Sequence, residues 1–179
     1  MIALFFISLA VFILGISAIV WNYGVPASIS ESYYLLPTSV RVFVFYIWTI
    51  IVALPLIIFW IELSEGKSQF LIFFGGAFLV GVGAAAPFKD NEMIEKVHVI
   101  CALCCSGFTQ LWILIYTSYW ILSIAMFILF YTIGKKTIGR IGYENKSYQT
   151  VSYSVTFFLE LAAFLSTYIA VYGYYKLQL

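Results

Sequence analysis

Six long apolar blocks, separated by short polar hinges, constrain this chain more than any other feature. Each block is close to the roughly 20 helical residues needed to cross a bilayer core about 30 Å thick. In lipid, only helices and closed barrels pair every backbone N–H and C=O group, and the blocks lack the alternation typical of strands. The sequence therefore predicts an all-α fold, a polytopic membrane protein built as a bundle of six transmembrane helices.

The blocks form one predicted transmembrane domain over residues 1–179. The predicted spans are 2–21, 42–61, 70–87, 97–116, 120–134 and 151–172. The fourth and fifth are separated at a tight hairpin near Thr117 to Tyr119, because a single helix from His98 to Lys135 would be about 55 Å long. The first block lacks the basic start of a signal peptide, so we interpret it as a retained span.

Composition excludes several classes of function. The chain is 64% hydrophobic and 9% charged, whereas about a quarter of the residues of soluble proteins are charged. Its longest polar stretches, 22–41 and 134–150, are too short for a soluble catalytic domain. A net charge of +1, without a clustered basic face, argues against nucleic acid as a partner. Any chemistry is therefore expected within the bundle or at its rim.

Basic residues divide unequally between the two sets of hinges. Hinges one, three and five carry Arg41, Lys89, Lys96, Lys135, Lys136, Arg140 and Lys146. The opposite side holds only Lys67 and Lys176. The positive-inside rule then predicts that hinges one, three and five are cytoplasmic and that both termini lie outside.

Small residues gather in the third predicted span. Ala77, Gly81 and Ala85 follow one another at intervals of four residues. Such stripes let helix backbones approach closely, which favours packing in lipid. We expect this span at the packed centre of the bundle. Alternatively, the same stripe forms a face for a homo-oligomer or for a membrane-protein partner.

Glu160 lies near the middle of the sixth predicted span. Ionisable groups are costly at membrane depth, so this side chain is expected to face the interior of the bundle. It is either part of a functional site or an acid satisfied by a neighbouring hydroxyl group.

His98, the only histidine, opens the fourth predicted span after an acidic hinge. His98, Cys101, Cys105 and Thr109 share one helical stripe, with Cys104 beside it, and we expect this stripe to face inward. Histidine and cysteine bind zinc, but this spacing is not that of a known zinc site. We therefore interpret the cysteines as packing residues and expect neither a metal ion nor a cofactor.

Hinge one is dense in hydroxyl groups. Ser28 with Glu31 three residues later fits a capping box, and Ser30 pairs similarly with Tyr33. The same groups can instead bind a lipid headgroup or a carbohydrate. The predicted ligand-binding residues are Ser28, Ser30, Glu31, Tyr34, His98 and Glu160. If hinges one and three share a face, His98, Asp90 and Ser30 are acid–base candidates around one polar opening.

The segment 26–30, the acidic hinge before the fourth span and the pair Val97-His98 resemble the FRAG/DRAM/SFK group of six-span membrane proteins and related bacterial families of unknown function. The resemblance implies a lipid-associated or sterol-handling protein without settled catalysis. The layout of that group would place hinge one outside the cytoplasm, opposite to the result of the charge count.

Three functional hypotheses follow. The first is a non-enzymatic bundle that binds or senses membrane lipids, or supports a partner. The second is a transporter or channel-like protein with Glu160 on an ion or proton path. The third is a membrane-embedded hydrolase that uses His98 and Asp90. A lipid binder should have an apolar-walled opening with polar groups at one end.

Overall fold

The computed structural model describes residues 2–144 and 148–179, with side chains described in 2–137 and 155–179. These residues form helices and contain no strand. The elements in chain order are α1 (Ile2–Tyr23), α2 (Ser32–Leu35), α3 (Arg41–Leu63), α4 (Gln69–Ala84), the 3-10 turn η1 (Phe88–Asp90), α5 (Glu92–Tyr116), α6 (Trp120–Glu144) and α7 (Tyr148–Leu177). The prediction of an all-α fold is confirmed.

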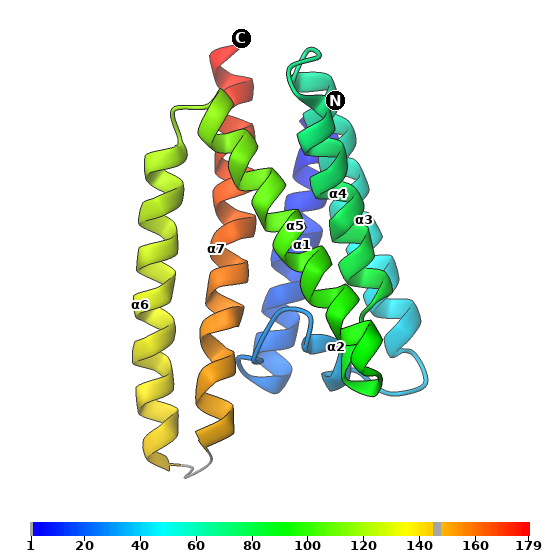
Figure 1. Cartoon of the computed structure of the whole chain (residues 1–179), viewed down its shortest axis with the longest axis vertical. Coiled ribbons are helices and arrows are strands. Elements are labelled where there is room, and N and C mark those ends of the chain that lie inside the picture. The colour runs from blue at the N-terminus through cyan, green and yellow to red at the C-terminus, as the bar shows by residue number, and fades with distance from the viewer. Residues whose placement is uncertain (1, 145–147) are drawn as a thin grey trace.

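The long helices run alternately in opposite directions, and α5 crosses the bundle obliquely (Figure 1). Both chain termini lie at one end of the bundle. The connection from α1 to α3 and the connection from α4 to α5 both lie at the other end. Hinges one and three therefore share a face, as the hypothesis of a common polar opening requires.

The apolar helices fit a multi-pass membrane protein. Within the described part of the chain, five helices are long and apolar enough to cross a membrane. They are α1, α3, α5, the segment Trp120–Thr137 of α6 and the segment Val155–Leu177 of α7. The remaining apolar helix, α4, has only 16 residues. Length and hydropathy thus support five crossings, one fewer than predicted.

Several helix ends differ from the predicted spans. Helix α5 begins at Glu92 rather than at 97, because the Asn91 side chain caps it, accepting a hydrogen bond from Met93 N at 2.8 Å. Helix α4 ends at Ala84, before the predicted 87, and α6 continues to Glu144. Most of the predicted fifth hinge is therefore helical. The predicted spans follow hydropathy, which indicates the part of a helix at membrane depth and not the residue at which the helix ends. Lys146 lies outside the described residues, as does the Arg140 side chain.

The predicted hairpin between the fourth and fifth spans is confirmed. Helix α5 ends at Tyr116 and α6 begins at Trp120. The Thr117 hydroxyl donates a hydrogen bond to Ile113 O at 2.8 Å and accepts one from Tyr119 N at 3.2 Å. Ile113 O also accepts a backbone bond from Thr117 N at 3.1 Å, so the backbone and the hydroxyl of Thr117 together close the end of α5, and the hydroxyl supplies an acceptor for an N–H group in the turn.

The small residues of α4 allow close packing against its neighbours α3 and α5. A Cβ atom on Gly83 would lie 2.7 Å from Thr49 Cγ2 of α3, and one on Gly81 would lie 2.9 Å from Cys101 Sγ of α5. Ala85 is buried, whereas Ala77 is exposed. Two members of the predicted stripe thus serve contacts within the chain.

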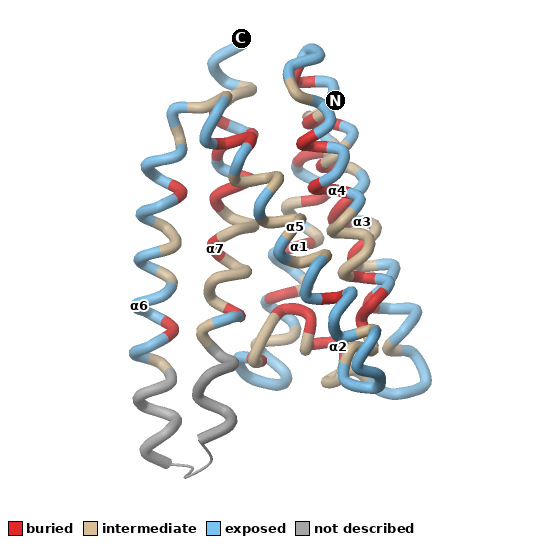
Figure 2. The backbone as a smooth tube through the Cα atoms, in the orientation of Figure 1, coloured by how far each residue is buried: buried red, intermediate tan, exposed pale blue. Residues whose placement is uncertain are grey.

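Buried residues lie mainly where helices run beside one another (Figure 2), and hydrogen bonds between side chains and neighbouring helices link these elements. The hydroxyl of Ser8 on α1 donates to Val52 O of α3 at 2.5 Å and bonds the Tyr168 hydroxyl of α7 at 2.6 Å. Gln110 of α5 accepts a bond from the Ser123 hydroxyl of α6 at 2.5 Å. Because apolar burial between helices contributes little in lipid, such bonds help to define the bundle.

Candidate functional site

Part of hinge one folds back into the bundle. Ile29 and Ser30 are each only 5% exposed, although they lie between two membrane-length helices. The chain turns here, with bonds from Ser32 N to Ile29 O and from Tyr33 N to Ser30 O, both 3.2 Å long. In such a turn, the first N–H groups lack acceptors within the turn itself. Those of Ile29 and Ser30 need an acceptor from another element.

Glu160 of α7 supplies that acceptor. Its Oε2 accepts a hydrogen bond from Ile29 N at 2.5 Å, and the backbone N–H of Ser30 also bonds to this carboxyl group. Next to it, Phe157 N donates to Ala27 O at 3.0 Å. The prediction that Glu160 faces the interior is confirmed. Its partners are backbone N–H groups and not the neighbouring hydroxyl that the sequence suggested.

The predicted capping box in hinge one is confirmed with one difference. Ser28 Oγ accepts a hydrogen bond from Glu31 N at 3.0 Å, as expected. The returning bond is shifted by one residue, because Glu31 Oε2 accepts from Ala27 N at 3.0 Å. Ser30 and Tyr33 are joined by their backbones, and not through the serine hydroxyl. Ser28 and Glu31 thus hold the shape of the hinge.

Hinge three packs directly on hinge one. The Lys89 ammonium forms an ion pair with Glu31, and Tyr34 Oη accepts a hydrogen bond from Lys89 N at 2.6 Å. Burial raises the pKa of the Tyr34 phenol, so this group is neutral at physiological pH. The Lys89 side chain is 49% exposed, so its ion pair is expected to contribute only about 0–1 kcal/mol.

His98 is held apart from the other acid–base candidates. The imidazole is 6% exposed, its Nδ1 lies 3.1 Å from Ala85 O, and its ring stacks on Phe88 with centres 4.4 Å apart. Asp90 is exposed in η1. Within the described residues, no hydrogen bond joins His98 to Asp90 or to Ser30. The contacts of His98 therefore tie the start of α5 to the end of α4, and no nucleophile–base pair is assembled.

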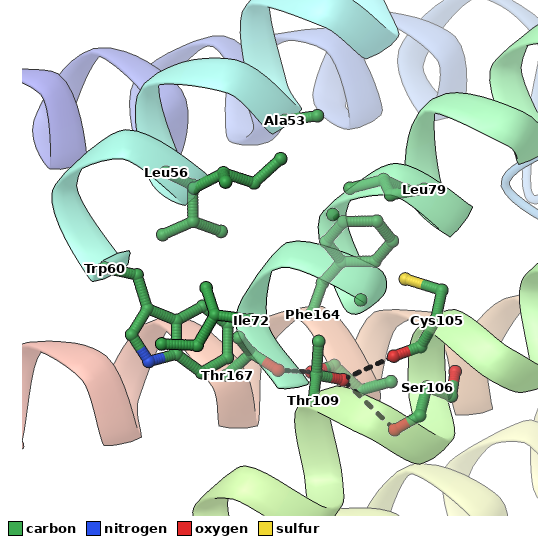
Figure 3. Close-up of a pocket in the computed structure, with 14 residues that line it drawn as sticks. Ala53, Leu56, Trp60, Ile72, Leu79, Cys105, Ser106, Thr109, Phe164 and Thr167 are labelled. Atoms are coloured by element: carbon green, nitrogen blue, oxygen red, sulfur yellow. Dashed lines mark hydrogen bonds between the residues drawn. The ribbon is translucent and has the colours of Figure 1, made fainter. Parts of the chain in front are cut away.

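Two adjoining cavities lie between α3, α4, α5 and α7. They share the lining residues Leu79, Cys105, Ser106, Ala163 and Phe164. The first cavity (Figure 3) reaches Trp60 and Ile72 and encloses about 470 Å³ of empty space, including its open part. The second reaches Ile29, Ser30 and Glu160 and encloses about 580 Å³ on the same basis. We call the two together the interhelical cavity.

Free polar groups lie at the centre of the interhelical cavity and near hinge one. The hydroxyls of Ser30 and Ser106 have no hydrogen-bond partner among the described residues. Ser106 borders both parts of the cavity, whereas Ser30 and the carboxyl group of Glu160 line only the second part. In the first cavity, the Thr109 hydroxyl already bonds Cys105 O at 2.9 Å within its own helix (Figure 3). The Thr167 hydroxyl likewise bonds Ala163 O at 2.8 Å. The first cavity therefore presents mostly apolar atoms.

The predicted stripe on α5 faces inward, as expected. Cys101 lies against Gly81, whereas Cys105 and Thr109 line the interhelical cavity. No group of three His, Cys, Asp or Glu side chains suited to a metal ion occurs within the described residues. Sequence reasoning missed Ser106 and Ala163, which border both parts of the cavity. Their only sequence signal is that they are small residues within apolar helices.

Comparison of the chain with protein-family models, with curated proteins and with solved structures finds no match. The resemblance to the FRAG/DRAM/SFK group therefore stays an expectation from sequence. Any functional proposal has to rest on the fold and on the interhelical cavity.

Proposed function

We propose that this chain is a non-enzymatic membrane protein that binds the hydrocarbon chain of a lipid in the interhelical cavity. The observation that supports the proposal most is the polarity of the cavity. Its first part is lined by apolar side chains such as Leu56, Ile57 and Ile72. Its second part adds the Ser30 hydroxyl and the Glu160 carboxyl group near hinge one. An amphiphile has the same division between a tail and a head.

The length of the interhelical cavity also favours a long, thin ligand. Phe45 lines the second part and Trp60 lines the first, and both belong to α3. Fifteen helical steps separate these residues, which corresponds to about 22 Å at 1.5 Å per residue. An extended hydrocarbon chain fits such a space better than a compact ligand does.

We further propose six crossings, with α4 as the shortest. Sixteen residues of helix span about 24 Å, which a locally thinned bilayer accommodates. The alternating directions of the long helices also favour a crossing by α4, since α3 and α5 run the same way (Figure 1). By the positive-inside rule, hinges one, three and five are then cytoplasmic and both termini lie outside.

Lipid binding is tested by native mass spectrometry of the delipidated protein titrated with monooleoylglycerol. Ala163→Leu fills the centre of the interhelical cavity, because Ala163 borders both of its parts. Ala125→Leu adds the same atoms on the exposed surface of α6 and is the matched control. We expect one bound lipid in the native chain and in the control, and at least tenfold weaker binding in Ala163→Leu. Equal binding by all three proteins contradicts the proposal.

The crossing by α4 is tested with single cysteines in a chain whose native cysteines are replaced. Lys67→Cys precedes α4, and Met93→Cys follows it, at an exposed position in the first turn of α5. With an impermeant maleimide on intact cells, we expect labelling at position 67 and none at position 93 until the cells are permeabilised. Labelling of both positions from the same side would exclude a crossing by α4.

A further inference from the structure

We propose that the interhelical cavity selects an uncharged amphiphile with an alcohol head, of the monoacylglycerol type, over phosphate-bearing lipids. This inference rests on the proposed function, since it names the head of the ligand whose tail fills the cavity. It is carried by the donors and acceptors that line the cavity near hinge one, and by the absence of basic side chains from its walls among the described residues.

The head end offers both donors and acceptors. The Ser30 and Ser106 hydroxyls are without partners among the described residues, so each can donate to a ligand oxygen. The Glu160 carboxyl group can accept about four hydrogen bonds, and the N–H groups of Ile29 and Ser30 use two of these positions. An alcohol can accept from a serine and donate to Glu160 at the same time.

A phosphate head satisfies only one side of this arrangement. Fully ionised phosphate oxygens accept hydrogen bonds from the serines but cannot donate to Glu160. An alcohol therefore matches the site better than a phosphate does.

The walls of the interhelical cavity also lack a countercharge for phosphate. No Lys, Arg or His side chain lines either part within the described residues. The nearby Lys89 is paired with Glu31, and the Arg41 guanidinium lies over the Tyr33 ring, 4.9 Å from its centre. Phosphate sites in proteins rely on basic side chains or helix N-termini. A phosphate buried beside Glu160 would have neither and would be strongly disfavoured.

The test compares two ligands that carry the same oleoyl chain: monooleoylglycerol and its phosphate, oleoyl lysophosphatidic acid. Binding to the full-length protein is measured in uncharged nanodiscs. We expect monooleoylglycerol to bind at least about tenfold more tightly than its phosphate, the change that one lost hydrogen bond to a charged group brings. Ser106→Ala should weaken the binding of both ligands, whereas Ser118→Ala, at an exposed turn, should leave both unchanged.

Each other outcome has a separate meaning. Equal binding of both ligands, lost in Ala163→Leu, would overturn the head preference and leave the proposed function standing. Tighter binding of the phosphate would likewise overturn the preference. If neither ligand binds, the proposed function and the inference both fail. If Ser106→Ala does not fold, the comparison of the two ligands on the native chain still decides.

Discussion

Removing the carboxyl group of Glu160 should loosen the contact of hinge one with α7 and raise the population in which the hinge is detached. In the structure, this group binds the N–H groups of Ile29 and Ser30, and both residues are only 5% exposed. Glu160→Ala leaves these donors without an acceptor. The nearby Phe157–Ala27 backbone bond remains, so the hinge loses one of the attachments to α7 that the described residues show.

The size of the effect follows from the number of orphaned donors. A buried N–H group without a partner costs about 1–3 kcal/mol, so two such groups cost about 2–6 kcal/mol. At the lower bound, the population of the detached hinge rises about 30-fold. Glu160→Gln should have a smaller effect, because its amide oxygen still accepts from a backbone N–H group.

Hydrogen–deuterium exchange in nanodiscs, followed in the peptide that covers residues 25–34, measures how often hinge one detaches. We expect exchange at Ile29 and Ser30 to be at least about 30-fold faster in Glu160→Ala than in the native chain. Glu62→Ala removes an exposed carboxyl group from α3 and is the matched control. Exchange in Glu160→Ala that matches the control would refute the capping role of Glu160.

Other predictions concern helix packing and the ion pair between the hinges. Gly83→Ala should lower the thermal midpoint, because the new Cβ would lie 2.7 Å from Thr49, with a cost of about 1–3 kcal/mol. In Gly107→Ala the new Cβ would have no neighbouring atom within 4 Å, so this variant should not lower the thermal midpoint. An equal decrease of the thermal midpoint in both variants would contradict the packing argument. Lys89→Ala breaks an exposed ion pair and should speed exchange in hinge one less than about fivefold. A larger change there would mean that the ion pair, and not Glu160, holds the hinge.

Features set by local pattern could be predicted from the sequence. The all-α fold follows from the apolar blocks, and the turn after Tyr116 follows from the length limit on one crossing. The hydrogen bond from Glu31 N to the Ser28 hydroxyl joins residues three positions apart, so the sequence pattern could predict it as well. The inward stripe of α5 follows from helical periodicity, which places Cys105 and Thr109 on one face.

Features set by distant contacts could not be predicted in the same way. The bond between Glu160 and Ile29 requires hinge one to fold back onto α7, and no local pattern indicates this. The interhelical cavity arises where small residues of different helices meet, as Ser106 and Ala163 do. The acid–base hypothesis for His98 and Asp90 required hinges one and three to share a face, which they do, but the imidazole lies against Ala85 O and does not meet Asp90.

The central claim, that a lipid chain lies between α3, α4, α5 and α7, is tested most directly by photo-crosslinking. A monoacylglycerol with a diazirine in its acyl chain is bound, activated and located by peptide mass spectrometry. We predict attachment at cavity residues such as Leu79, Ser106 and Phe164, reduced by excess unlabelled monooleoylglycerol. Attachment spread over outward-facing residues such as Ile128, unaffected by the competitor, would contradict the claim.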